Sequence, residues 1–131
     1  MKIAVIDEDP IVRDFVVGTL MYSVNREVLP FENGLDAWVH FEGYGVPDIV
    51  VADVNLTDLT GTELLEKVKG INRNTVVILY SDISAKEAAV RAAGADAFLA
   101  KPFGVNELFN LVQRFVVDGR SNNQYPTPAL P

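Results

Sequence analysis

The chain has 131 residues, 49% of them hydrophobic, and carries a net charge of −7 from 18 acidic and 11 basic side chains. This length suits one domain with a single core and is too short for two ordinary domains. The acidic balance argues against direct binding to nucleic acid, because the phosphate backbone is bound through basic surfaces.

The chain contains no cysteine, which excludes disulfides, thiolate metal sites and thiol nucleophiles. The N-terminal segment MKIAVIDEDP is too short in its apolar run and too charged for a signal peptide. No apolar stretch approaches the roughly 20 residues of a membrane span. We therefore expect a cytoplasmic protein that does not insert into membranes.

Short runs rich in β-branched and aliphatic residues predict five β-strands. They cover Lys2–Ile6, Glu27–Phe31, Asp48–Ala52, Thr75–Tyr80 and Ala97–Ala100. Pro30 lies in the second run and cannot donate a hydrogen bond to a neighbouring strand, so this strand is expected at an edge of the sheet.

The segments that follow the strands predict five helices. The first begins at Pro10, the second follows Asn33-Gly34, the others begin near Gly61, Ala85 and Val105, and the last one is expected to end near Val117. The sequences Thr60-x-x-Glu63 and Ser84-x-x-Glu87 have the spacing of capping boxes. Gly70 and Gly94 are expected to end the third and fourth helices in the left-handed conformation.

The strict alternation of strands and helices predicts an α/β fold with a parallel sheet covered on both faces. An edge position for the second strand favours the flavodoxin-like (βα)5 topology with strand order 2-1-3-4-5. We expect one domain over residues 1–118, and residues 119–131, which contain three prolines and no apolar periodicity, are expected to form a disordered tail or linker.

Polar side chains follow four of the predicted strands. In a parallel sheet, functional sites usually lie at the carboxyl ends of the strands. Asp7 and Glu8 follow the first strand, Asp53 follows the third, Ser81 and Asp82 follow the fourth, and Lys101 follows the fifth. Clustered carboxylates require compensation by a cation, a proton or an amine, and Mg²⁺ is commonly held by one or two carboxylates together with phosphate oxygens. The pattern thus indicates a Mg²⁺-dependent phosphate site, in which a carboxylate can act as the nucleophile toward phosphorus.

The segments VIDED, VVADVNLTDLTG, VVILYSD and GADAFLAKPF occur in this order on successive strands. Together they resemble the receiver (REC) domain of bacterial two-component response regulators, over about residues 1–118. The resemblance implies a phosphoprotein of a phosphorelay, which accepts a phosphoryl group from a sensor histidine kinase or a histidine phosphotransfer protein. It further implies self-catalysed acceptance and slow autodephosphorylation rather than conventional enzyme activity.

The resemblance also implies a role for each matching residue. Asp53 matches the phosphoacceptor, Asp7 and Glu8 match the acidic pair that organises Mg²⁺, and Asn55 matches the residue whose backbone carbonyl ligates the metal. Ser81 matches the switch hydroxyl and Phe98 the aromatic switch, whose ring is expected to turn inward on activation. Lys101 matches the lysine of the KPF motif, which usually has a cis peptide before its proline. Partner binding or homodimerisation is expected at the face of helix 4, strand 5 and helix 5.

Three features depart from the family pattern. Asp82 stands where the family usually has a small residue. It is expected either to repel or obstruct the phosphodonor or hinder the hydrolysing water, or to point outward and help to cap the next helix. Thr57 replaces a common proline and is expected to loosen its loop. The short stretch from Ser81 to Lys101 predicts an abbreviated fourth helix.

Two alternatives stand beside the phosphoacceptor function. One is a receiver-like docking module that is poorly or not phosphorylated because of Asp82, and the other is a Mg²⁺ phosphohydrolase with an aspartyl intermediate. The second is the weaker alternative, because no second catalytic acid motif follows Asp53.

Overall fold

Five parallel strands form one sheet in the order β2-β1-β3-β4-β5, as the sequence predicts. The strands are β1 (Lys2–Ile6), β2 (Glu27–Phe31), β3 (Ile49–Asp53), β4 (Val76–Ser81) and β5 (Ala97–Ala100). The computed structural model describes residues 1–22 and 26–124, the last eight of them by their backbone alone. Pro30 lies in β2, at the edge of the sheet. A proline has no N–H to donate to a neighbouring strand, and an edge strand tolerates this better than an inner strand.

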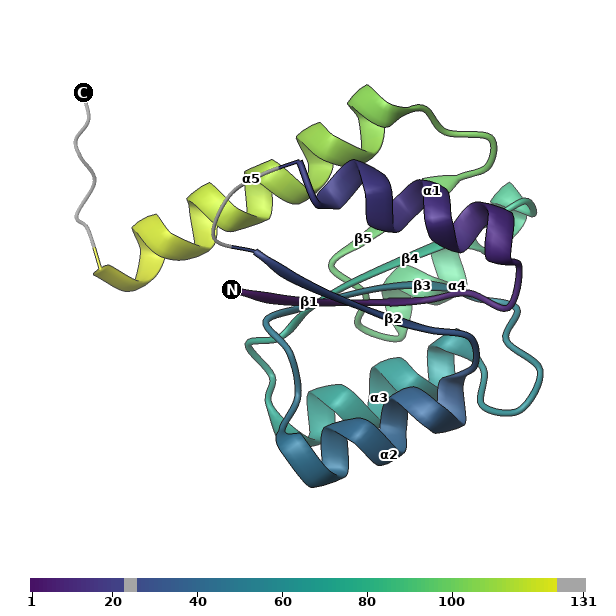
Figure 1. The fold of residues 1–131 in the computed structure, drawn as a ribbon, viewed down its shortest axis with the longest axis horizontal. Helices are drawn as coiled ribbons and strands as arrows, with labels where there is room; N and C mark the ends of the chain where they lie inside the picture. Colours follow the sequence, from purple (N-terminus) through teal and green to yellow (C-terminus); the bar gives the residue numbers. More distant parts are fainter. Residues whose placement is uncertain (23–25, 125–131) are drawn as a thin grey trace.

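Helices cover both faces of the sheet (Figure 1). They are α1 (Pro10–Leu20), α2 (Gly34–Tyr44), α3 (Gly61–Ile71), α4 (Glu87–Ala92) and α5 (Val105–Gln124), with a 3₁₀ turn, η1 (Ser84–Lys86), before α4. Helices α1 and α5 lie on one face, and α2 and α3 lie on the other (Figure 1). None of the helices in the described part of the chain is long and apolar enough to span a membrane.

The core has two layers because successive strand residues point to opposite faces of the sheet. Ile3 and Val5 of β1 pack in the cluster shared with α1 and α5. Ala4 and Ile6 of the same strand pack in the cluster shared with α2, α3 and Val90 of α4. This alternation decides which side chains at the ends of the strands share a face.

Strands β3 and β4 each begin and end one residue later than predicted. Asp53 and Ser81 are consequently the last residues of their strands rather than the first residues after them. The fourth helix is short, as predicted: α4 has 6 residues.

The predicted helix ends are confirmed in part. The capping box of Thr60 and Glu63 is present at the start of α3, and Gly94 has the positive φ of 112° expected after α4. Gly70 does not end α3, because the helix runs to Ile71 and Asn72 terminates it in an extended conformation.

The capping box predicted from Ser84 is wrong. The β4–α4 connection first turns as η1, with the Lys86 N–H donating to the Ile83 carbonyl at 3.1 Å, and α4 then starts at Glu87 without a side-chain cap. The predicted end of the last helix near Val117 is also wrong, since α5 continues to Gln124. Backbone hydrogen bonds of a helix need no apolar face, so the loss of periodicity did not mark its end. The rest of the predicted tail, residues 125–131, lies outside the described residues.

Candidate functional site

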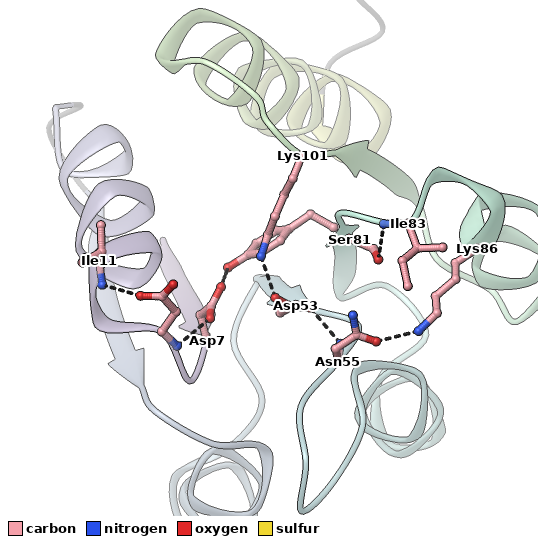
Figure 2. Close-up of polar contacts among 10 residues, drawn as sticks. Asp7, Ile11, Asp53, Asn55, Ser81, Ile83, Lys86 and Lys101 are labelled. Atoms are coloured by element: carbon pink, nitrogen blue, oxygen red, sulfur yellow. Dashed lines mark hydrogen bonds and ion pairs between the residues drawn. The ribbon is translucent and has the colours of Figure 1, made fainter.

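The side chains predicted to act together lie at one edge of the sheet (Figure 2). Asp53 and Ser81 end the inner strands β3 and β4, Asp7 follows β1, and Lys101 follows β5. Because these strands are parallel, their carboxyl ends meet at the same edge. The structure thereby brings Asp7, Asp53, Ser81 and Lys101 to one place.

Asp53 is held by two hydrogen bonds, one to each carboxylate oxygen. Its Oδ2 accepts from the Lys101 ammonium at 2.8 Å, and its Oδ1 accepts from the Asn55 backbone N–H at 2.7 Å (Figure 2). Burial disfavours the charged Lys101 ammonium, but the hydrogen bond and charge of Asp53, with the charges of Asp7 and Asp82, outweigh burial and raise the pKa of Lys101. Lys101 is therefore a permanent cation directly beside the Asp53 carboxylate.

Asp7 is buried, with 2% of its surface exposed. Its Oδ1 accepts from the Asp9 N–H at 2.8 Å and its Oδ2 accepts from the Tyr80 hydroxyl at 2.6 Å. Burial raises the pKa of Asp7; the hydrogen bonds from Tyr80 and Asp9 oppose that rise, and the nearby charge of Asp53 adds to it. The carboxylates of Asp7 and Asp53 thus share the charge of the Lys101 ammonium, which favours the ionised form of Asp7.

Glu8 points to a different partner. Its Oε2 accepts from both the backbone N–H of Thr57, at 2.7 Å, and the Thr57 hydroxyl, at 2.6 Å. The prediction that Thr57 loosens its loop is wrong, because these bonds tie the loop to Glu8 and a proline could not donate the backbone bond. Within the described residues, no three His, Cys, Asp or Glu side chains converge closely enough to hold a metal ion.

The remaining oxygen donors nevertheless suit a small divalent cation. Two carboxylates, those of Asp7 and Asp53, lie at the carboxyl ends of neighbouring strands, and the charge of Asp53 raises the pKa of Asp7. Mg²⁺ takes one or two carboxylates and completes its shell with carbonyl, water or phosphate oxygens. The chemistry of the Asp7 and Asp53 carboxylates therefore fits Mg²⁺.

Ser81 and Phe98 are both buried, on β4 and β5. The Ser81 hydroxyl oxygen accepts from the Ile83 N–H at 3.0 Å (Figure 2). Phe98 is 8% exposed and packs in the core layer that includes Val90 of α4. The ring therefore needs no further inward turn to become buried.

Asp82 is exposed and lines a surface pocket with Lys101 and Phe103. Neither η1 nor α4 has a side-chain cap, so the alternative in which Asp82 caps the next helix is wrong. Its charge acts on Lys101 instead. The peptide bond between Lys101 and Pro102 is cis, as the family resemblance implies.

Sequence reasoning missed two residues at this edge. Tyr80 precedes Ser81 on β4 and was assigned only to an apolar strand, although its hydroxyl contacts Asp7. Lys86, in η1, donates from its ammonium to the Asn55 side-chain oxygen at 2.5 Å (Figure 2). A phenol at the end of an otherwise aliphatic strand was the available signal for Tyr80, because buried tyrosine hydroxyls usually have a partner.

Comparison with known proteins gives one consistent result. A family model described as the response regulator receiver domain matches residues 3–113. The chain is 27% identical over 107 residues to the chemotaxis protein CheY1 of Helicobacter pylori, covering 79% of this chain and 86% of that protein. It is 34% identical over 118 residues to the two-component response regulator-like PRR37 of Oryza sativa, covering 86% of this chain.

Solved structures agree with the sequence relatives. The BeF3-activated receiver domain of DrrB superimposes with a TM-score of 0.79 at 30% identity, covering 88% of this chain and 97% of that domain. The chain spans only 16% of the length of the rice regulators it matches. The likeness to those regulators therefore extends to a small part of their length.

Proposed function

This chain belongs to the response regulator receiver family, and we propose that it accepts a phosphoryl group on Asp53 in a Mg²⁺-dependent reaction. The proposed donor is the phosphohistidine of a sensor histidine kinase or of a histidine phosphotransfer protein. The observation that carries the proposal is the 2.8 Å contact between the Lys101 ammonium and the Asp53 carboxylate, next to the buried carboxylate of Asp7. A nucleophile, a fixed cation and a second oxygen ligand then lie at one sheet edge.

In the proposed reaction, a carboxylate oxygen of Asp53 forms a bond to phosphorus, and the bond from phosphorus to the donor nitrogen breaks. The electron pair leaves with the imidazole, and the product is an aspartyl phosphate, a mixed anhydride. Lys101 compensates the charge of the phosphoryl oxygens, since phosphoryl transfer depends mainly on positioning and charge stabilisation. Mg²⁺, when bound, supplies further charge compensation between phosphate and carboxylate oxygens.

The proposed metal ligands are the side chains of Asp7, Glu8 and Asp53 and the backbone carbonyl of Asn55. Asp7 and Asp53 are supported by their position at neighbouring strand ends. Glu8 has to leave its contact with Thr57, or share it, to approach the same ion.

The proposed output is a two-state switch. Phosphorylation draws the Ser81 hydroxyl from the Ile83 N–H toward the phosphoryl oxygens, and the packing around Phe98 adjusts. The surface formed by α4, β5 and α5 then changes its affinity for an output partner or a second copy. We place this signalling domain in the cytoplasm and assign it no catalysis beyond its own phosphorylation and slow dephosphorylation.

Asp82 favours a second candidate function, because its charge lies in the same pocket as Lys101 and faces an incoming anionic donor. In that case the domain signals by docking without phosphorylation. The discriminating experiment is incubation with Mg²⁺ and acetyl phosphate, followed by intact-mass measurement.

Three outcomes separate the candidates. A gain of one phosphoryl group that is absent in Asp53→Asn and in excess EDTA supports the receiver function. No gain in the wild-type protein would contradict it and support the docking module. Rapid release of phosphate from many phosphate esters would instead support the phosphohydrolase.

A further inference from the structure

Asp7, Asp53 and Tyr80 form a row across three adjacent strands, β1, β3 and β4. The register pairs Asp53 directly with Tyr80, and it pairs Ile6 with Ala52, which places Asp7 beside Asp53 one residue further on. Tyr80 shares its core layer with Ile3 and Val5, which lie four and two residues before Asp7 in the same alternation. All three side chains consequently belong to the sheet face covered by α1 and α5.

The Tyr80 side chain crosses this row. Its ring is completely buried, and its hydroxyl reaches Asp7, directly after β1, a strand that is separated from β4 by β3, with an oxygen-to-oxygen distance of 2.6 Å. In this bond the phenol hydroxyl donates and the Oδ2 of Asp7 accepts. The Tyr80 hydroxyl therefore fixes one oxygen of Asp7 while the Asp9 N–H fixes the other.

The same ring contacts the cation of the site. The Lys101 ammonium lies 5.2 Å from the centre of the Tyr80 ring. The Phe103 ring packs against the Tyr80 ring, with 5.3 Å between the ring centroids. A cation over an aromatic face is attracted by the ring quadrupole. One side chain thus contacts Asp7 and Lys101, the two charged groups that flank Asp53.

We propose that Tyr80 is a positioning residue of the phosphoacceptor site, which orients Asp7 for Mg²⁺ through its hydroxyl and supports Lys101 through its ring. The inference rests on the proposed function, since it concerns the metal of that reaction. Hydrogen-bond donors behind a ligating carboxylate hold its orientation, and their removal commonly weakens metal binding by about 10- to 100-fold. Tyr80→Phe removes the hydroxyl but keeps the ring and its contact with Lys101. This variant therefore isolates the hydrogen bond to Asp7.

The first test measures Mg²⁺ affinity by isothermal titration calorimetry, without any phosphodonor. We expect Tyr80→Phe to bind Mg²⁺ about 10-fold more weakly than the wild-type protein. Tyr44→Phe is the matched control, because Tyr44 is exposed and lies on α2; its affinity should equal that of the wild type. Equal affinity in Tyr80→Phe would overturn the inference.

The second test uses the wild-type protein and so does not depend on the variant folding. Tyrosine labelled with ¹³C at Cζ is followed by NMR during Mg²⁺ titration. The Tyr80 signal should shift along the calorimetric binding curve, whereas the signals of exposed Tyr22 and Tyr44 should stay in place. A Tyr80 signal that does not respond to saturating Mg²⁺ would exclude the link through Asp7.

The two proposals fail in distinguishable ways. If the wild-type protein gains a phosphoryl group but Tyr80→Phe binds Mg²⁺ normally, the receiver function stands and the role of Tyr80 does not. If Mg²⁺ binding depends on Tyr80 but no phosphoryl group is gained, the positioning role stands and the phosphoacceptor function does not. A wild-type protein that binds no Mg²⁺ would overturn the role of Tyr80, and phosphorylation that persists in EDTA would then show that acceptance needs no metal.

Discussion

The ammonium of Lys86 donates a hydrogen bond to the side-chain oxygen of Asn55, two residues after the proposed phosphoacceptor Asp53. Lys86 lies in the 3₁₀ turn η1, and Asn55 lies in the loop after β3. Besides Lys101, a second cation is therefore held close to the loop that follows Asp53.

We predict that Lys86→Met slows phosphorylation by acetyl phosphate. The donor is an anion, and a partly exposed charge contributes roughly up to 1 kcal/mol, equivalent to about 5-fold in rate. The measurement is the initial rate of adduct formation by intact mass, and the difference should shrink at high salt. Lys67→Met removes the same charge on α3, where Lys67 contacts Trp38, and should leave the rate unchanged. Equal slowing by both substitutions would point to net charge rather than to the position of Lys86.

A second prediction concerns the contact between Thr57 and Glu8. The Thr57 hydroxyl competes with Mg²⁺ for the Glu8 carboxylate if Glu8 must move to join the metal. Removing this one hydrogen bond in Thr57→Val should strengthen Mg²⁺ binding by about 2- to 5-fold, because a net hydrogen bond contributes roughly 0.5–1 kcal/mol. Calorimetry checks the change, and Thr57→Ser, which keeps a hydroxyl, should behave like the wild type. Unchanged affinity in Thr57→Val would show that Glu8 need not leave Thr57.

The buried carboxylate of Asp7 predicts a pH dependence of stability. Burial raises the pKa of Asp7 in the folded state above its unfolded value. The unfolded chain then loses this proton at a lower pH than the folded chain, so stability is highest below the unfolded pKa and falls as the pH rises through the folded pKa. Without Mg²⁺, Asp7→Asn should raise the thermal midpoint at pH 7 and have less effect at pH 4. A midpoint raised equally at both pH values would exclude ionisation of Asp7 as the cause.

The fold was predictable because its signals are local and repeated. Apolar runs and helix starts gave the elements, and Pro30 in an edge strand favoured the observed strand order. The strand ends also located Asp7, Asp53 and Lys101 correctly, since parallel strands present their carboxyl ends at one edge.

The contacts between those side chains were not predictable from the sequence. The hydrogen bonds from Tyr80 to Asp7, from Lys86 to Asn55 and from Thr57 to Glu8 join residues 73, 31 and 49 positions apart. Each depends on the direction of a side chain beyond the end of its strand, where periodicity no longer constrains it. The turn at η1, which brings Lys86 to Asn55, also replaced the capping box expected at Ser84.

Asp82 provides the last prediction. It lines the pocket beside Lys101, and its charge is among those that raise the pKa of Lys101. An anionic phosphodonor that approaches Asp53 meets this charge, so Asp82→Ala should accelerate phosphorylation by acetyl phosphate, by up to about 5-fold for one exposed charge. Glu66→Ala, which removes an exposed acid from α3, should not accelerate it.

The salt dependence distinguishes repulsion from obstruction by Asp82. If repulsion is the cause, the wild-type rate should rise with salt toward that of Asp82→Ala, because salt screens exposed charges. If bulk is the cause, Asp82→Asn should be as slow as the wild type at every salt concentration, because the two side chains have nearly the same size. Identical phosphorylation and dephosphorylation kinetics in Asp82→Ala and the wild type would remove Asp82 from the control of this site.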